Sequence, residues 1–221
     1  MSWEVFDRKA DRYDAWFDSP EGSAIFSAEV ECLRRLLPSD PSGWAEVGVG
    51  TGRFAAALDI PRGIDPSVPM LLKARERGIR TQQGRAEDLP YRTDSLAGIL
   101  MTVTLCFLDN PESALIECRR VLEPGGKLVQ GIVPAESSWG RHYQEEAEAG
   151  HPFYSVSRFY TCQETIELAE AAGFEFEEAA STLPRAPGED LSEIPVMNGI
   201  VDGSGFVSIR FSADTRERTL L

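Results

Sequence analysis

The sequence is poor in the residues that build metal centres and disulfide frameworks. Its 221 residues include four cysteines and two histidines. The cysteines are scattered along the chain without a C-x-x-C pair, at Cys32, Cys106, Cys118 and Cys162. Because structural zinc sites need closely spaced ligand pairs, we expect no bound metal. We interpret the cysteines as buried free thiols.

Basic residues are scarce beside acidic ones. The chain has 22 lysines and arginines against 36 aspartates and glutamates, a formal net charge of −14. A surface this acidic repels phosphate backbones, so nucleic acid is not an expected partner. The most basic stretch, residues 73–80, is interrupted by Glu76 and is typical of a solvated helix face.

Long apolar runs are missing as well. No run approaches the roughly 20 apolar residues that a membrane-spanning helix needs. Residues 1–18 carry Trp, Asp, Glu and Arg throughout, unlike a signal peptide. We therefore expect a soluble, cytoplasmic protein with no membrane partner. A chain of this length with 42% hydrophobic residues can bury the core of one domain.

The sequence does contain an alternation of short apolar runs and helix-like segments. Five runs are typical of buried strands: 44–47, 62–64, 79–82, 96–102 and 127–133. Helices are predicted between them at 53–58, 68–77 and 111–122. This order predicts parallel βαβ units with helices on both faces of a sheet.

Further elements are predicted on either side of this alternation. Helical spacing covers residues 5–18 and 21–37, and a helix over 162–172 follows the last parallel strand. Two more strands are expected at 174–179 and 205–211. A Pro/Gly-rich excursion at 184–195 lies between them. An excursion of that length lets the final strand enter the sheet in an antiparallel direction.

A cluster of glycines follows the first strand and precedes a helix. Gly48, Gly50 and Gly52 allow positive φ angles and a close approach of a ligand to the backbone. A dinucleotide-binding turn requires a further glycine where this chain has Arg53. Glu46, just before the turn, suits the ammonium group of a methionine moiety better than a pyrophosphate. The charge pattern therefore favours a cofactor that carries an amino acid.

An acidic residue, Asp65, ends the next strand in the sequence Gly63-Ile64-Asp65-Pro66. A carboxylate at this place can accept hydrogen bonds from both hydroxyls of a ribose. The alternative is that Asp65 caps the helix that begins near Val68. The spacing from the glycine turn favours the ribose.

These motifs resemble those of class I S-adenosylmethionine-dependent methyltransferases, most of all the type 11 group related to ubiquinone and menaquinone biosynthesis enzymes. The resemblance runs from Phe6-x-x-x-Ala10-x-x-Tyr13-Asp14 through residues 121–126, and more loosely through 159–161 and 172–174. It implies an α/β, Rossmann-like sheet of seven strands. That sheet would be mostly parallel with an antiparallel last strand, helices on both faces and N-terminal helices as a partial lid.

The resemblance implies one methyltransferase domain over residues 1–221. Its parts would be an N-terminal helical lid (1–40), a cofactor-binding core (44–133), a substrate lid segment (134–161) and the C-terminal part of the sheet (162–221). The implied contacts to S-adenosylmethionine come from Tyr13, Glu46, Gly48, Gly50, Thr51, Gly52, Asp65, Pro66, Ala86, Glu87, Met101 and Thr102.

Two of these implied contacts keep an alternative. Arg85 stands where the family often has an acidic residue, so the adenine ring would be read by backbone N–H groups of Ala86 or Glu87. Tyr13 is either part of a lid over the cofactor or one more core aromatic of an amphipathic helix.

Methyl transfer from a sulfonium is an in-line displacement, which positioning and exclusion of water can largely catalyse. A base is needed only if the acceptor must lose a proton. The candidates for that base are His142 and His151, since histidine titrates in the useful range. The candidates for substrate binding are Tyr143, Tyr154, Arg158 and Tyr160. Arg158 could equally pair with one of the many acidic residues.

The sequence thus predicts a methyltransferase that acts on a small molecule through an oxygen, nitrogen, sulfur or carbon atom. Two other classes stay open. One is a non-catalytic, S-adenosylmethionine-binding regulatory module that has kept the fold. The other is a nucleotide-dependent oxidoreductase, which Glu46 and Arg53 disfavour.

Overall fold

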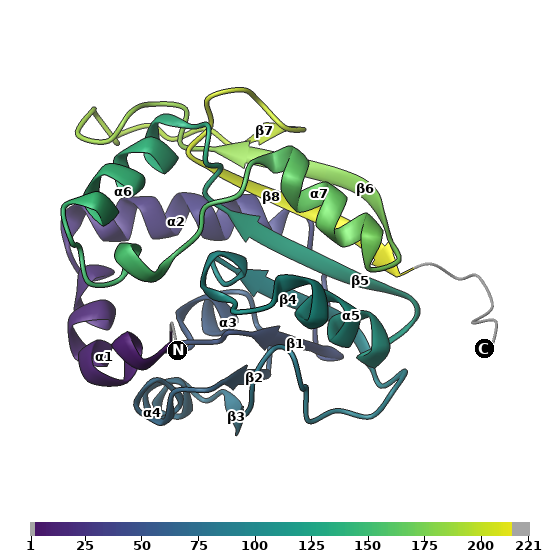
Figure 1. The fold of residues 1–221 in the computed structure, drawn as a ribbon. Helices are drawn as coiled ribbons and strands as arrows, with labels where there is room; N and C mark the ends of the chain where they lie inside the picture. The colour runs from purple at the N-terminus through teal and green to yellow at the C-terminus, as the bar shows by residue number, and fades with distance from the viewer. Residues whose placement is uncertain (1–2, 214–221) are drawn as a thin grey trace.

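The predicted strands lie side by side in one sheet, and those that are apolar throughout need helices on both faces. The run at 79–82, which we predicted as a buried strand, is instead a polar and largely exposed strand at the edge of the sheet. The computed structural model describes residues 3–213, whose arrangement is shown in Figure 1. The sheet has eight strands in the order β3-β2-β1-β4-β5-β8-β6-β7. Their bounds are β1 Trp44–Val47, β2 Arg62–Asp65, β3 Arg80–Gln83, β4 Leu96–Thr102, β5 Leu122–Ile132, β6 Phe174–Thr182, β7 Met197–Asn198 and β8 Phe206–Ala213.

The first five strands are parallel, as predicted. β1 lies between β2 and β4, and all four of its residues are buried. Gly98 of β4 pairs with Trp44, and a Cβ atom at Gly98 would lie 2.0 Å from the indole ring. β5 begins at Leu122 rather than at residue 127, because Leu122 already pairs with Leu96 before the register shifts.

The three C-terminal strands run antiparallel to their neighbours. β8 lies between β5 and β6 and is antiparallel to both, which confirms the expected direction of the last long strand. The predicted count of seven strands was wrong, because β7 adds a two-residue strand on the edge beside β6. Gly199 N donates to the Ala179 carbonyl oxygen there, and the Ser181 hydroxyl donates to the Gly199 carbonyl oxygen. Two residues are too few to give a periodic signal.

Helices cover both faces of the sheet (Figure 1). One core includes Leu115 and Cys118 of α5, and the other includes Leu33 of α2 and Phe54 of α3. Within residues 3–213, none of the helices has the length and apolar character needed to cross a bilayer. The bounds are α1 Glu4–Trp16, α2 Pro20–Arg34, α3 Arg53–Ala57, α4 Val68–Glu76, α5 Pro111–Val121, α6 Ser138–Glu148 and α7 Cys162–Ala171, with 3₁₀ turns η1 Leu105–Phe107 and η2 Tyr154–Val156.

The segment from 134 to 161, which we predicted as a substrate lid, contains α6 and η2. Ser137 caps α6, since its hydroxyl oxygen accepts a hydrogen bond from Gly140 N at 2.9 Å. Arg158 N donates to the Cys106 carbonyl oxygen at 2.8 Å, which ties the end of the segment to η1. α6 and α1 lie on the same side of the molecule, at the left of Figure 1.

Helix α1 is fastened to α3 and α4 by ion pairs. Asp14 accepts from Arg53 at 2.7 Å and from Arg77 at 2.9 Å, and Asp11 pairs with Lys73 at 2.7 Å. Burial acts to raise the pKa of Asp14, but hydrogen bonds from Arg53 and other partners lower it to about 2. Asp14 is therefore ionised at neutral pH and holds α1 above the glycine turn.

Candidate active site

The glycine turn between β1 and α3 needs glycine for two different reasons. Gly48, Gly50 and Gly52 have φ angles of +76°, +51° and +80°, which other residues rarely adopt. A Cβ atom on Gly48 would lie 2.4 Å from the Thr104 side chain. At Gly50 it would meet nothing closer than Tyr13 Cε1, at 4.0 Å. Gly50 thus borders open space in which a ligand can approach the backbone.

Asp65 lies beside this turn, at the end of β2. Its two carboxylate oxygens accept hydrogen bonds from Gly50 N and Ser67 N, both at 2.9 Å. The capping of α4 falls to Ser67, whose hydroxyl oxygen accepts from Met70 N. Burial raises the pKa of Asp65 to about 6. Each oxygen keeps a lone pair for a ligand hydroxyl, as ribose recognition requires.

A cavity of about 750 Å³ opens above the turn and Asp65, and we name it the donor cavity. Eight of the sequence-predicted cofactor residues line it: Tyr13, Gly48, Gly50, Asp65, Pro66, Ala86, Glu87 and Thr102. The other four, Glu46, Thr51, Gly52 and Met101, are not part of its lining. The sequence thus located the cavity, although some of the named positions lie behind its wall.

Glu46 is one of the four predicted residues outside the lining of the donor cavity. It is only 1% exposed, and it accepts a hydrogen bond from the backbone N–H of Ala55 in α3. Its Oε2 atom has no hydrogen-bond partner among the described residues. Burial raises the pKa of Glu46 well above the ordinary glutamate value. In this structure Glu46 ties α3 to β1 beneath the turn and does not face the donor cavity.

The far end of the donor cavity is closed by charged side chains. Arg85 lies between Glu87, at 3.3 Å, and Asp109, at 3.0 Å. Ala86 is buried beside it. The side chain that departs from the family pattern is therefore part of the wall where an adenine edge would lie. Besides Arg85, five aromatic or polar lining residues were not among the predicted contacts: Trp3, Phe6, Thr104, Phe107 and Asp109.

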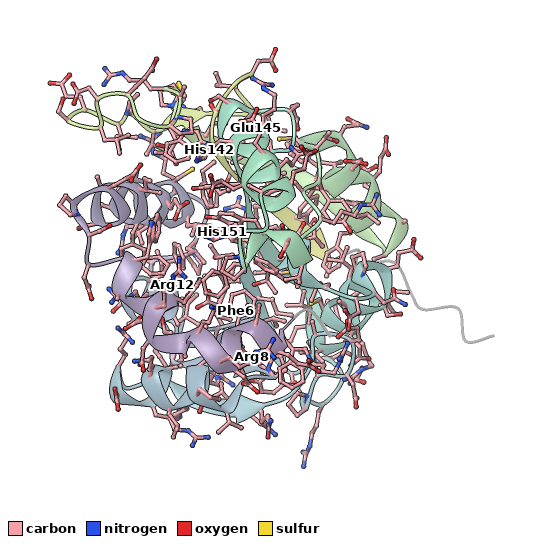
Figure 2. All side chains as sticks on the ribbon, turned by 60° about the vertical axis from the view of Figure 1, so that its left-hand side comes forward. Phe6, Arg8, Arg12, His142, Glu145 and His151 are labelled. Atoms are coloured by element: carbon pink, nitrogen blue, oxygen red, sulfur yellow. The ribbon has the colours of Figure 1, made fainter. Side chains whose placement is uncertain are left out.

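A second cavity of about 1,050 Å³ adjoins the first, and we name it the acceptor cavity. Phe6, Tyr13, Val103 and Phe107 line both cavities and form the boundary between them. The remaining lining comes from several elements: Arg12, Trp16, Phe17, Glu29, Phe54, Cys106, Val133, Tyr143, His151, Phe153, Tyr154 and Phe159. Figure 2 views this side of the molecule, with Phe6 and Arg12 on α1.

Val103, at the boundary between the two cavities, has an unusual backbone conformation. Its φ angle is +47°, which is unusual for a β-branched residue and costs free energy. Its N–H donates to the Gly131 carbonyl oxygen at 2.8 Å, which holds the conformation. Strained residues of this kind concentrate at functional sites.

Tyr13 satisfies both of the interpretations that the sequence left open. Its ring packs against Phe6 at 5.6 Å and Phe153 at 5.8 Å between centroids, as a core aromatic would. The ring also covers Gly50 and lines both cavities. Tyr13 is thus a packed aromatic in the position of a lid.

The four predicted substrate residues of the lid segment divide into two groups. The rings of Tyr143 and Tyr154 stack at 4.5 Å and line the acceptor cavity. Arg158 instead projects into solvent, with its guanidinium 4.7 Å from the Tyr160 ring and 3.8 Å from Glu164. This pair borders a separate surface groove. The structure therefore brings two of the four predicted substrate residues to the acceptor cavity.

The two histidines are also separated. His151 lines the acceptor cavity, stacks on Tyr154 at 4.3 Å and has a buried Nδ1 atom without a hydrogen-bond partner among the described residues. Burial lowers its pKa, so it is neutral at pH 7. His142 lies on α6 and lines neither cavity. Figure 2 shows His151 between α6 and α1, near Arg12, with His142 further along α6.

Comparisons with known proteins agree with this geometry. Residues 45–130 match a family model described as a methyltransferase domain. A crystal structure from Thermotoga maritima, described as an S-adenosylmethionine-dependent methyltransferase and possible histamine N-methyltransferase, is 39% identical with a TM-score of 0.90. The match covers 97% of this chain and 100% of that one.

Two curated relatives extend the comparison. An uncharacterised protein of Mycobacterium tuberculosis is 39% identical over 203 residues, which are 91% of this chain and 71% of its own length. The ubiquinone/menaquinone biosynthesis C-methyltransferase of Paracoccus denitrificans is 31% identical over 139 residues, 57% of this chain and 56% of its own.

The sheet order and the site at the strand ends define a class I, Rossmann-like methyltransferase fold. The chain belongs to the S-adenosylmethionine-dependent methyltransferases. Its cofactor is S-adenosylmethionine. The donor cavity fits that molecule, because Gly50 leaves open space and Asp65 retains acceptor capacity at the position expected for a ribose.

Proposed function

We propose that this protein transfers the methyl group of S-adenosylmethionine to a small molecule bound in the acceptor cavity. The observation that carries the proposal is the shared boundary of the two cavities at Phe6, Tyr13, Val103 and Phe107. An in-line displacement requires donor and acceptor to meet across one short distance. Two adjoining cavities supply that arrangement. Histamine, named in the description of the Thermotoga protein, is also a small molecule.

Within this proposal the donor cavity holds the cofactor through a few groups. Asp65 accepts hydrogen bonds from the ribose hydroxyls, and Gly48 and Gly50 let the methionine portion lie against the backbone. Backbone N–H groups of Ala86 and Glu87 read the adenine ring, and Arg85 closes that end. The bound cofactor supplies a methyl group on a positively charged sulfur, which leaves as a neutral thioether.

The acceptor cavity contributes mainly orientation and exclusion of water. Its walls are largely aromatic, and α1, α6 and η2 cover it. Packed rings such as Tyr143 and Tyr154 fix the acceptor in one orientation and keep bulk water away from the reacting atoms. His151 lines this cavity and is our candidate for a base, whereas His142 lines neither cavity.

The alternatives gain less support. A regulatory module has no need of a second cavity beside the donor cavity. An oxidoreductase would need a close approach of pyrophosphate at Arg53, whose guanidinium is held instead by Asp14 and Asp18. The acceptor cavity therefore favours catalysis by methyl transfer.

The first test is thermal unfolding of the full chain with S-adenosylhomocysteine, S-adenosylmethionine, NAD or NADP. A ligand at roughly 100 times its dissociation constant adds about 2.7 kcal/mol to the free energy of unfolding. We expect a rise in melting temperature with the two adenosyl compounds alone. Release of S-adenosylhomocysteine from labelled cofactor with pooled metabolites then tests turnover. Stabilisation by NAD alone would contradict the proposal, and cofactor binding without turnover on any pool would favour the regulatory module.

A further inference from the structure

A single carboxylate, Glu29 of α2, lies in the wall of the acceptor cavity. Its side chain is buried, with 7% of the residue exposed, although glutamate is among the residues least often found inside proteins. Among residues 3–213 it forms no hydrogen bond and no ion pair. A charged group in this state is costly unless a partner arrives from outside the chain.

Within the described residues, no cation is paired with this carboxylate. The groups whose pKa the charge of Glu29 raises are Cys32 on its own helix and three tyrosines, Tyr13 of α1, Tyr143 of α6 and Tyr154 of η2. None of them carries a positive charge. Burial alone raises the pKa of Glu29 to about 8, because no neighbouring cation compensates it. The site can therefore accept one positive charge from a ligand.

The rest of the cavity wall also suits a cation. Aromatic side chains from several elements line it, among them Phe6, Phe17, Phe54, Phe153 and Phe159. The face of an aromatic ring attracts a positively charged group, and the attraction grows when water is excluded. A buried carboxylate with aromatic rings around it is a typical environment for an ammonium group.

Two basic residues define the other end. Arg12 and His151 both line the acceptor cavity. Burial is the main cause that lowers the pKa of His151, and the positive charge of Arg12 acts in the same direction. Neither residue forms an ion pair with Glu29 in the described part of the chain. The positive charge of Arg12 would repel a second positive charge on a ligand.

We propose that the methyl acceptor is an amine with one positive charge and an apolar body, whose nitrogen is held by Glu29 against the tyrosine and phenylalanine rings. This inference rests on the proposed function and assigns its substrate class. It makes Glu29 the residue that selects amines over neutral compounds of the same shape.

The proposal also accounts for the proton. An ammonium nitrogen has no free electron pair, so it first gives one proton to the Glu29 carboxylate. The nitrogen lone pair then forms the new N–C bond, and the electrons of the broken C–S bond stay on sulfur. The methylated nitrogen is again positively charged and leaves with the product. Glu29 keeps its proton and releases it to solvent when the next ammonium group binds. A carboxyl group that binds protons near neutral pH suits this exchange.

The test measures binding by calorimetry to the full chain saturated with S-adenosylhomocysteine. The probes are phenethylamine and hexylamine, each compared with the alcohol of the same carbon skeleton. We expect the amines to bind roughly tenfold or more tightly than the alcohols, as a buried charge pair predicts. Glu29→Gln should abolish that preference and leave alcohol binding unchanged. Glu31→Gln, at an exposed position of the same helix, is the matched control and should bind all probes like the wild type.

Two further measurements keep the outcomes distinct. Unchanged affinity of Glu29→Gln for S-adenosylhomocysteine shows that the variant is folded, and mass spectrometry of the wild-type reaction identifies N-methylated amine. Equal binding of amines and alcohols by the wild type, or an intact preference in Glu29→Gln, overturns the inference. A chain that binds the cofactor and methylates only neutral or anionic acceptors also overturns it and leaves the proposed function standing. A chain that does not bind the cofactor contradicts the proposed function itself.

Discussion

The donor cavity and the acceptor cavity lie side by side, yet they are built in opposite ways. The donor cavity takes its central parts from one stretch of chain, from the turn after β1 to the start of α4, where short loops follow strand ends. The acceptor cavity takes side chains from six elements that are spread along the chain, α1, α2, α3, η1, α6 and η2. A cofactor site can thus be fixed by a contiguous motif, whereas the acceptor site depends on how distant helices come together.

The two carboxylates of these cavities show the same contrast. Asp65 accepts two hydrogen bonds from backbone N–H groups, and burial raises its pKa only to about 6. Glu29 accepts none among the described residues, and burial raises its pKa to about 8. The donor site is therefore preorganised by its own backbone. The acceptor site is completed by its ligand.

The largest effect is expected at the preorganised carboxylate. Asp65→Ala removes the acceptor for the ribose hydroxyls and leaves Gly50 N without its partner. Because hydrogen bonds to a charged group contribute about 1.5–3 kcal/mol each, affinity for S-adenosylhomocysteine should fall by roughly 100-fold or more. Isothermal calorimetry measures this loss.

Asp202→Ala is the matched control, because Asp202 is an exposed acidic residue outside both cavities. It should bind the cofactor product like the wild type. If Asp65→Ala retains wild-type affinity, the ribose assignment and the contrast between the two carboxylates are both wrong.

A smaller effect is expected on stability at the other carboxylate. The pKa of Glu29 rises from 4.5 in the unfolded chain to about 8 in the folded protein. The folded state therefore holds a proton between these values that the unfolded chain releases, and wild-type stability declines as pH rises through this window. Glu29→Gln does not titrate. Relative to the wild type it should gain about 2 kcal/mol between roughly pH 5.5 and pH 7, which lie inside this window.

Chemical denaturation of both proteins across this pH range, without ligand, measures the difference. Titration of other residues, including Glu46 and Asp65, is common to both proteins and cancels. A difference that stays constant with pH would mean that Glu29 has an ordinary pKa, and that its site is not short of a positive charge.

The smallest effect distinguishes the two histidines. His151→Ala removes a ring that stacks on Tyr154 and lines the acceptor cavity. We expect kcat/KM for the acceptor to fall by roughly three- to tenfold, about 1 kcal/mol, with cofactor affinity unchanged. His142→Ala, on the same lid segment but outside the cavity, should keep wild-type kinetics. Equal losses in the two variants would show that the lid acts as a whole rather than through the cavity wall.

Much of the donor half could be predicted from the sequence, because its signals are local. β1 and β4 have the predicted bounds, and the glycine turn and Asp65 occupy the strand ends as expected. The prediction failed where backbone pairing over a distance decides the outcome. β7 exists only because β6 offers it an edge. Glu46 accepts a hydrogen bond from the backbone of Ala55 in α3, and its contact to the cofactor stays a prediction.

The sequence indicated a segment that contributes to the acceptor cavity, but not which of its side chains line that cavity. The segment 134–161 was singled out as the substrate lid, and two of its tyrosines and one of its histidines line the cavity. Arg158 and Tyr160, equally suitable by residue type, face a surface groove instead. Residue type in a loop does not determine which way a side chain points, because the packing of α6 and η2 sets that direction.

By itself the sequence determined the class of cofactor and the strand ends at which it binds. The glycines with positive φ and the acidic residue at the end of the next strand are local signals, because each depends on the backbone of a few consecutive residues. Only the tertiary structure decided the acceptor site. Glu29, Tyr13 and His151 lie far apart in the chain, and their shared cavity exists because burial of apolar surface brings α1, α2 and η2 together over the sheet.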